Sequence, residues 1–194
     1  MDELTAQITD EIAAVTDFLE QWLGRRSRWN GTVELSSASD NYGQALWNGS
    51  ISIDRIVAQT DLRWRTLIHE ALHHFSVGLT PPTYFELYGW EEGIVEQLQR
   101  IHRPEILLSQ GMDIPQAIFA AAEKSHEFSE YVEALESLRL ALGQPIFDFY
   151  HSLLATSLKN RPAHIIGLGR LLPPEYFRDF QRIFATAFSK LRGG

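Results

Sequence analysis

Apolar side chains recur every three or four residues from Leu4 to Leu23, with acidic residues between them. This spacing gathers the apolar side chains on one face of a helix. Gly24 follows the last of them, and glycine often ends a helix because it adopts a positive φ at low cost. The pattern predicts an amphipathic N-terminal helix, over about residues 1–26, that packs against the rest of the protein.

The pattern changes in residues 31–57, where apolar and polar side chains alternate over short stretches. Asn48-Gly49 lies between two of these stretches and favours a hairpin turn, because both residues tolerate positive φ. We expect a small antiparallel sheet of three strands, with a polar loop at Ser36–Asn41. The expected strands are Val33–Leu35, Tyr42–Trp47 and Ile51–Ile53.

A helical pattern of apolar positions follows the strands and extends to about Ser76. Thr60 or Asp61 is expected to cap its first turn, because a short polar side chain can accept hydrogen bonds from the first N–H groups of a helix. Gly78 fits the exit of the chain from this helix. We therefore expect a helix over about residues 60–76.

Prolines divide the remainder of the chain. Pro81-Pro82 predicts that Leu79–Gly89 is a loop, because a proline inside a helix removes one of its hydrogen bonds. A helix is then expected from Trp90 to Arg100, with Pro104 beyond it. Helices also account for the apolar pattern of residues 105–192. The expected breaks there are Gly143–Pro145 and Asn160–Pro162, and the last two helices are expected at Ile146–Leu158 and Glu175–Leu191.

The composition is typical of a packed globular domain, since 44% of the 194 residues are apolar. A net charge of −8 and a pI of about 5.3 argue against nucleic acid as a partner, because binding phosphates requires a basic surface. Residues 1–26 lack the features of a signal peptide, and no apolar run approaches the ~18 residues of a membrane span. We expect a cytoplasmic protein without a nucleic-acid or membrane partner.

Cysteine is absent, so any metal ion must be bound by His, Asp or Glu. The segment His69-Glu70-x-x-His73 falls within an expected helix, where residues four apart share a face. Its two imidazoles therefore meet at one point, and neutral imidazoles suit Zn²⁺. Glu70 lies beside that point and can act as general base toward a water molecule that the ion activates. The motif alone also arises by chance, but its apolar flanks indicate a buried helix whose polar side chains need partners.

The next expected helix opens with Trp90-Glu91-Glu92-Gly93-Ile94-Val95-Glu96 and offers three carboxylates as a third ligand. Glu92 and Glu96 share a helix face, so one can bind a metal while the other supports a histidine. Glu91 is the alternative ligand, and otherwise a solvated acid that the helix dipole stabilises. His74 is expected to be a polar edge residue or a partner of Glu70, and His102 is expected at the surface.

The spacing of these residues resembles a known family. His69-Glu70-x-x-His73, followed after eighteen intervening residues by Glu92, is similar to the gluzincin metallopeptidases, the thermolysin and leukotriene-A4-hydrolase type. The Trp-x-Glu-Gly-x-x-Glu form around Glu92 resembles the wider peptidase MA-like group. The resemblance implies that Glu92 is the third zinc ligand and that Glu96 supports His69. It covers about residues 41–99. The metzincin pattern does not fit, because Ser76 and Leu79 stand where it requires Gly and His.

This resemblance implies an α+β, zincin-like fold with a small antiparallel sheet over the HExxH helix and a mostly helical C-terminal half. The chain would be one domain, with the N-terminal helix (1–26), the sheet and metal-binding helices (31–102) and the helical half (105–192). The implied function is a zinc metallopeptidase that acts on a peptide or protein substrate. The edge strand of the small sheet would hold the substrate in an extended conformation.

Enzymes of this kind usually add a Tyr or His that stabilises the oxyanion. The candidates here are His126, Tyr131, Tyr150, His151 and His164. Two alternatives to an enzyme remain. One is a catalytically silent zincin-fold module that retains the zinc site for regulation or binding, and the other is a protein without metal, in which His69 and His73 are core residues. Four aromatic residues flank the expected cleft, Tyr42, Trp47, Tyr84 and Tyr88.

Overall fold

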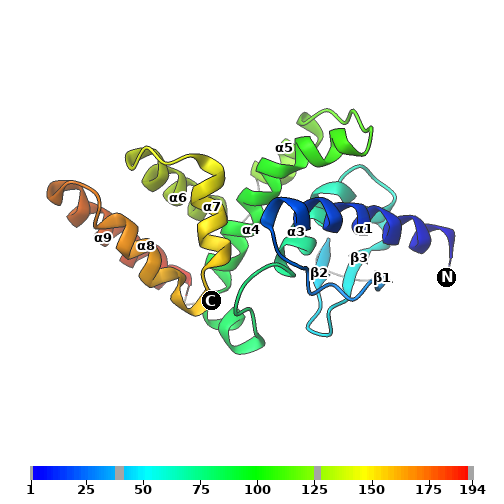
Figure 1. Ribbon diagram of the computed structural model, residues 1–194, viewed down its shortest axis with the longest axis horizontal. Coiled ribbons are helices and arrows are strands. Elements are labelled where there is room, and N and C mark those ends of the chain that lie inside the picture. Colours follow the sequence, from blue (N-terminus) through cyan, green and yellow to red (C-terminus); the bar gives the residue numbers. More distant parts are fainter. Residues whose placement is uncertain (1, 38–41, 125–127, 192–194) are drawn as a thin grey trace. The chain divides into compact units, whose positions relative to one another are not determined.

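The computed structural model describes residues 2–37, 42–124 and 128–191 of the chain (Figure 1). The chain forms two compact units, and each is described by itself. Unit 1 takes its described residues from 1–75 and 98–125, and unit 2 takes them from 76–97 and 126–194. The expected single domain of residues 1–194 stays a prediction.

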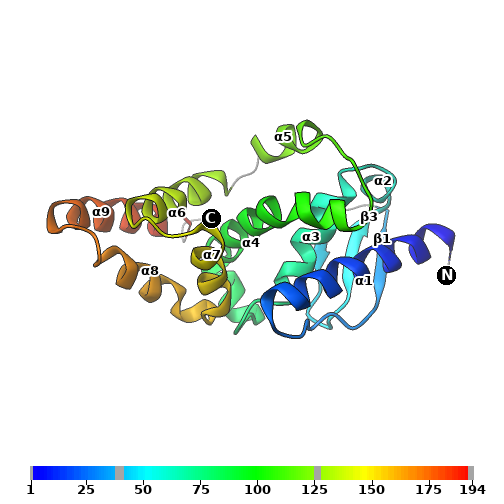
Figure 2. The same ribbon diagram turned by 45° about the horizontal axis from the view of Figure 1, so that its top comes forward.

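The N-terminal helix of unit 1, α1 (Glu3–Leu23), confirms the predicted amphipathic helix. Asp2 caps it by accepting a hydrogen bond from the Thr5 N–H, and its hydrogen bonds hold the pKa of the Asp2 carboxyl well below the usual range. Gly24 ends the helix in the left-handed conformation, with φ of 63°. The helix runs beside β1 (Val33–Ser36) and α3 (Arg63–His73) in Figures 1 and 2. Its buried residues are Ile8, Ile12, Val15, Thr16 and Leu19.

Three short strands form the sheet of unit 1, in the order β1-β3-β2, and all three lie where the pattern places them. The other two strands are β2 (Gly43–Ala45) and β3 (Ile51–Asp54). They form the predicted antiparallel hairpin, in which Leu46 donates to the Ser50 carbonyl and Gly49 has φ of 93°. Of the expected loop Ser36–Asn41, Ser36 belongs to β1 and residues 38–41 lie outside the described part.

The prediction of an antiparallel sheet is wrong for β1, which pairs with β3 in parallel. Strand β3 lies between β1 and β2, so β1 pairs with a strand that is not its neighbour in the sequence. The central position suits β3 because Ile51 and Ile53 are fully buried. Parallel pairing sets Val33 opposite Ile51 and Leu35 opposite Ile53, so the apolar residues of both strands lie on one face. The observed class is α+β, with a small mixed sheet and a majority of helix.

The HExxH segment lies in α3, which is shorter than predicted. Neither Thr60 nor Asp61 caps it through a side chain, because Leu62 stands at the N-cap position and the Thr60 hydroxyl donates to the Val57 carbonyl instead. Asp54 caps the short helix α2 (Arg55–Ala58) just before it. The helix ends at His73, three residues early. Arg28 explains this end, since its guanidinium donates to the backbone carbonyls of His73 and His74, which would otherwise continue the helix.

The predicted loop Leu79–Gly89 is wrong, because α4 runs from Pro81 to Ser109. A proline is well tolerated in the first turn of a helix, where its missing N–H has no partner to lose. The helix bends at Leu87, whose φ of −130° and ψ of 22° are not helical, and it continues through Pro104. Residues 81–97 of α4 belong to unit 2, and residues 98–109 belong to unit 1.

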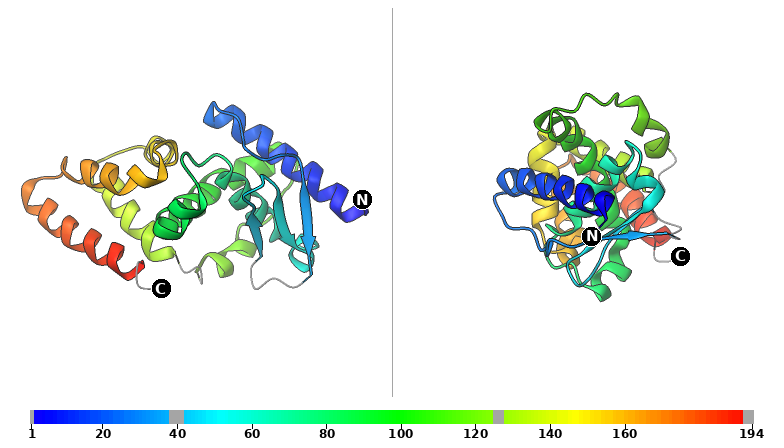
Figure 3. Two further views of the ribbon diagram at one scale, coloured as in Figure 1. Left: turned by 90° about the horizontal axis from the view of Figure 1, so that it is seen from below. Right: turned by 90° about the vertical axis from the view of Figure 1, so that its right-hand side faces the viewer.

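The remaining described elements are helical, as predicted for residues 105–192. One expected break is misplaced, because α8 starts at Arg161 with Pro162 in its first turn. Figure 3 shows α8 beside α9, and Gly169 permits this contact, since a Cβ there would overlap the Phe180 ring. These elements are α5 (Ala117–Lys124), α6 (Ser129–Ala141), α7 (Ile146–Ala155), the 3-10 turn η1 (Leu158–Asn160), α8 (Arg161–Gly169) and α9 (Pro174–Leu191).

Among the described residues, no helix combines the length and the apolar character that a membrane crossing requires.

A fully buried ion pair lies in unit 2, where the Arg161 guanidinium contacts the Glu91 carboxylate. The Ser76 hydroxyl donates to the same carboxylate over 2.7 Å and contacts the Arg161 guanidinium as well. Arg161 further donates to the Thr156 carbonyl over 3.1 Å. The pair therefore joins the N-terminal part of α4, the segment after α3 and the start of α8.

Removing Arg161 is expected to destabilise the fold strongly. Arg161→Met leaves the buried Glu91 carboxylate without its cation, which typically costs about 3–5 kcal/mol. The double variant Glu91→Met/Arg161→Met removes both charges and should recover at least half of that loss. Urea denaturation followed by circular dichroism measures both effects. A double variant that is no more stable than Arg161→Met would contradict the assignment.

Candidate metal centre

Two imidazoles face the same way from α3. His69 and His73 are one helical turn apart, their ring centroids lie 5.0 Å from each other, and their planes form an angle of 71°. Both side chains are buried, and α3 is apolar around them at Leu67, Ile68 and Leu72. The local sequence thus builds a helix that buries two imidazoles together, as predicted from the four-residue spacing.

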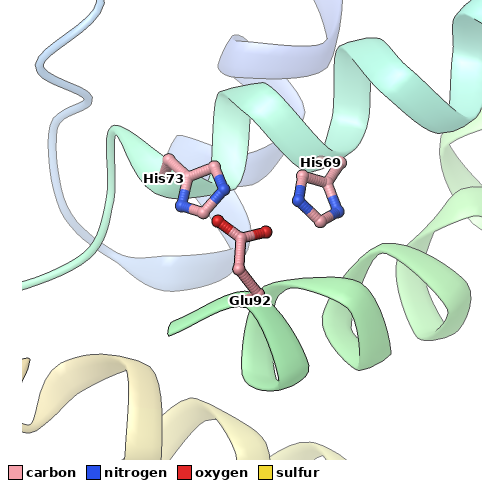
Figure 4. A group of neighbouring side chains, drawn as sticks. All are labelled: His69, His73 and Glu92. Atoms are coloured by element: carbon pink, nitrogen blue, oxygen red, sulfur yellow. The ribbon is translucent and has the colours of Figure 1, made fainter. Parts of the chain in front are cut away.

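Glu92 of α4 completes a group with the two histidines (Figure 4). One ligand atom from each of His69, His73 and Glu92 can be chosen so that all lie within 4.8 Å of one another, and all three residues are buried. Two imidazoles with one carboxylate are a donor set that suits Zn²⁺.

Glu91, the alternative ligand, is committed elsewhere. Its carboxylate is fully buried against Arg161 and Ser76, so the expectation of a solvated acid at a helix N-terminus is wrong. Adjacent positions on a helix point about 100° apart. Arg161 lies far downstream in the sequence, and nothing in the sequence around Glu91 indicates this partner.

From the sequence, Tyr84 is expected only as one of four aromatic residues beside the cleft. The structure gives it a direct contact with Glu92. Its hydroxyl donates to Glu92 Oε1 over 2.6 Å. In a straight helix, eight residues span about 12 Å, so a contact between these positions is unexpected. The bend at Leu87 lies between them. A carboxylate with one oxygen fixed in this way presents its other oxygen in a defined direction.

Glu70 is buried on α3 and accepts a hydrogen bond of 2.7 Å at Oε2 from the backbone N–H of Ala45 in β2. His74, the expected partner of Glu70, does not supply this hydrogen bond. His74 is buried rather than at an edge, and burial lowers its pKa to about 4, helped by the charges of Arg28 and His73 and opposed by a hydrogen bond with the Ser50 backbone. His74 is therefore neutral at physiological pH.

Two further histidine and carboxylate predictions have different outcomes. Glu96 is fully buried on α4, one turn after Glu92, and its support of His69 stays a prediction. His102 is not at the surface. It is fully buried in unit 1, and the centroids of its ring and of the Trp22 ring lie 4.2 Å apart.

The described oxyanion candidates belong to unit 2, and an oxyanion role for any of them stays a prediction. The ring of Tyr131 packs edge-on against the ring of Trp90, with 4.8 Å between the ring centroids. Burial raises the pKa of the Tyr131 hydroxyl far above the usual range. Tyr150 is fully buried beside Phe149. His151 and His164 are half-buried on α7 and α8. His126 lies outside the described residues.

The comparisons with family models, curated proteins and solved structures found no match to this chain. The gluzincin resemblance therefore rests on the residues and spacings of the chain itself.

The group is expected to bind one Zn²⁺ per chain. Replacing a ligand should cost more than the 10- to 100-fold typical of residues behind the ligands, so His73→Ala and Glu92→Gln should weaken binding at least ~100-fold. Glu91→Met/Arg161→Met removes the alternative ligand together with its ion-pair partner, leaves no uncompensated buried charge, and should change affinity less than ~3-fold. Zinc titration in competition with a chromophoric chelator measures the affinities. Equal losses in Glu91→Met/Arg161→Met and Glu92→Gln would contradict the assignment of Glu92.

Tyr84→Phe should weaken Zn²⁺ binding about 10-fold, because Glu92 loses the hydrogen bond that orients it. Tyr88→Phe is the matched control. It removes a hydroxyl from the same helix, where the ring of Tyr88 lies against Phe128 at 5.6 Å. The same chelator titration applies, with circular dichroism to compare folding. Equal affinities of the two variants would exclude a role for the Tyr84 hydroxyl.

Proposed function

We propose that this chain is a zinc-dependent metallopeptidase of gluzincin type with a zincin-like fold. The observation that carries the proposal is the buried group of His69, His73 and Glu92, with the Glu70 carboxylate on the helix turn between the two histidines. A structural zinc site has no use for that carboxylate, and such sites generally have four protein ligands. Three ligands leave one coordination position open for chemistry.

The roles of the residues follow from their chemistry. His69, His73 and Glu92 would hold Zn²⁺, which when bound supplies Lewis-acid activation of a water molecule and of the substrate carbonyl. Glu70 accepts a proton as the attacking water forms the new C–O bond to the peptide carbonyl, and it then passes this proton to the amine nitrogen as the C–N bond breaks. Tyr84 orients Glu92 through its hydroxyl, and Arg28 stabilises the end of α3 beside His73.

A peptide or protein substrate is supported by the position of β2. It is an edge strand of the described sheet, and its Ala45 N–H lies next to Glu70. Edge strands leave backbone groups open to pairing with an extended chain. The gluzincin resemblance gives the same expectation. The general base and a surface for extended backbone are thus adjacent in unit 1.

Glu70→Gln is expected to retain Zn²⁺ and to lose hydrolysis by about 10²- to 10⁴-fold, because glutamine keeps the size of the side chain but cannot accept the proton. The assay measures cleavage of fluorescein-labelled casein and of a quenched-fluorescent peptide library by the zinc-loaded protein. His73→Ala should lose both zinc and cleavage. Undiminished cleavage by Glu70→Gln would exclude this mechanism. Zinc binding without any cleavage by the unmodified chain would favour a silent regulatory or binding module.

A further inference from the structure

The hydrogen bond from Ala45 N–H to Glu70 depends on how the backbone of β2 is oriented. In an antiparallel pair, the backbone groups of successive residues point alternately toward and away from the partner strand. Tyr42 accepts from Asp54, and Leu46 donates to Ser50, so these residues face β3. Ala45 lies between them in this alternation, and its N–H points outward, to the open edge of the sheet.

Glu70 reaches this outward N–H because β2 lies unusually close to α3. A Cβ on Gly43 would lie 2.5 Å from the Thr66 Cγ2 methyl and 3.2 Å from Glu70 Cγ. The first distance is shorter than real Cβ contacts, and Thr66 is a short, buried side chain that has little room to move. The φ of Gly43 is not positive, so glycine is required here for space and not for backbone conformation.

We propose that Gly43 and the backbone N–H of Ala45 position Glu70 for its role as general base. This inference rests on the proposed function. The N–H occupies Glu70 Oε2, so the carboxylate is held in one rotamer and Oε1 is the oxygen that receives the proton. Gly43 contributes by allowing β2 to approach α3 closely enough for the bond to form. Both are positioning groups, since neither needs to touch the substrate for this effect.

The contact has a consequence for the edge of the sheet. An N–H that points outward from an edge strand normally pairs with water or with an added strand. Here the carboxylate of Glu70 takes that place. The same hydrogen bond therefore orients the base and withdraws one donor from the edge of β2, next to the reacting centre.

The hydrogen bond itself can be tested without metal or substrate. In the metal-free protein, the Ala45 amide should exchange with solvent at least about 10-fold more slowly than in Glu70→Ala, because the carboxylate is its partner. Nuclear magnetic resonance of the amide also reports the bond through a downfield proton shift that Glu70→Ala removes. Equal exchange rates in the two proteins would overturn the inference, whatever the protein hydrolyses.

Two variants test the role of the bond in catalysis. Ala45→Pro removes the N–H, and proline is tolerated on an edge strand where the N–H is not part of the ladder. It should lower kcat about 10- to 100-fold on the best quenched-fluorescent peptide, with KM and zinc content nearly unchanged. Ala45→Ser keeps the N–H and should exceed Ala45→Pro in kcat by about tenfold. Equal kcat values would overturn the inference.

Gly43→Ala provides an independent test with a built-in rescue. The added methyl should separate β2 from α3 and lower kcat about 10-fold or more. Thr66→Ser in the same chain removes the Cγ2 methyl that the new Cβ would strike and should restore at least part of kcat and of the Ala45 amide protection. Without such rescue the proposed role of Gly43 falls. If Glu70→Gln retains full hydrolysis, the proposed function fails first, and the positioning role fails with it.

Discussion

Burying a carboxylate or an imidazole is costly unless a cation or hydrogen-bond donors compensate it, and this constraint governs the centre of the protein. Glu91, Glu92 and Glu70 are all buried, and each meets the constraint differently. Glu91 pairs with Arg161, Glu92 accepts from Tyr84, and Glu70 accepts from a backbone N–H. A divalent cation bound by the two imidazoles and the Glu92 carboxylate would likewise compensate the cost of burying them. For this reason we propose that the group is a metal site.

The division of labour between neighbouring carboxylates follows from helix geometry. Glu91 and Glu92 are adjacent in sequence but project about 100° apart, so their carboxylates meet different neighbours. Glu91 supports the architecture of unit 2 through its ion pair, whereas Glu92 joins the histidines. A carboxylate that takes part in a buried ion pair and a carboxylate of the proposed metal site are thus adjacent on one turn of α4. The bend at Leu87 gives Glu92 a further contact, from Tyr84.

The small sheet contributes both to the core of unit 1 and to the surroundings of Glu70. Its central strand carries Ile51 and Ile53 into the interior of unit 1, and its edge strand lies against the HExxH helix. Close approach of β2 to α3 is possible because position 43 is glycine. As a result, the Ala45 N–H of β2 lies within hydrogen-bond distance of the Glu70 side chain on α3.

Local periodicity determined much of what is now seen. The amphipathic pattern predicted α1, the Asn48-Gly49 turn predicted the hairpin of β2 and β3, and the four-residue spacing predicted that His69 and His73 share a face. These features depend on interactions between residues close in sequence. The loop prediction at Pro81-Pro82 was wrong, because proline interrupts a helix in its interior but is tolerated in its first turn.

Only the tertiary structure decided how distant residues are paired. The parallel pairing of β1 with β3, the ion pair of Glu91 with Arg161 and the burial of His102 each join segments that no local pattern connects. The sequence already favours Glu92 over Glu91 as the ligand, through the helix face that it shares with Glu96 and through the gluzincin resemblance, but only the structure gives Glu91 its partner Arg161. The sequence by itself determined which side chains could bind a metal ion. Packing decided which of them meet, because burial and charge compensation depend on neighbours that the fold brings together.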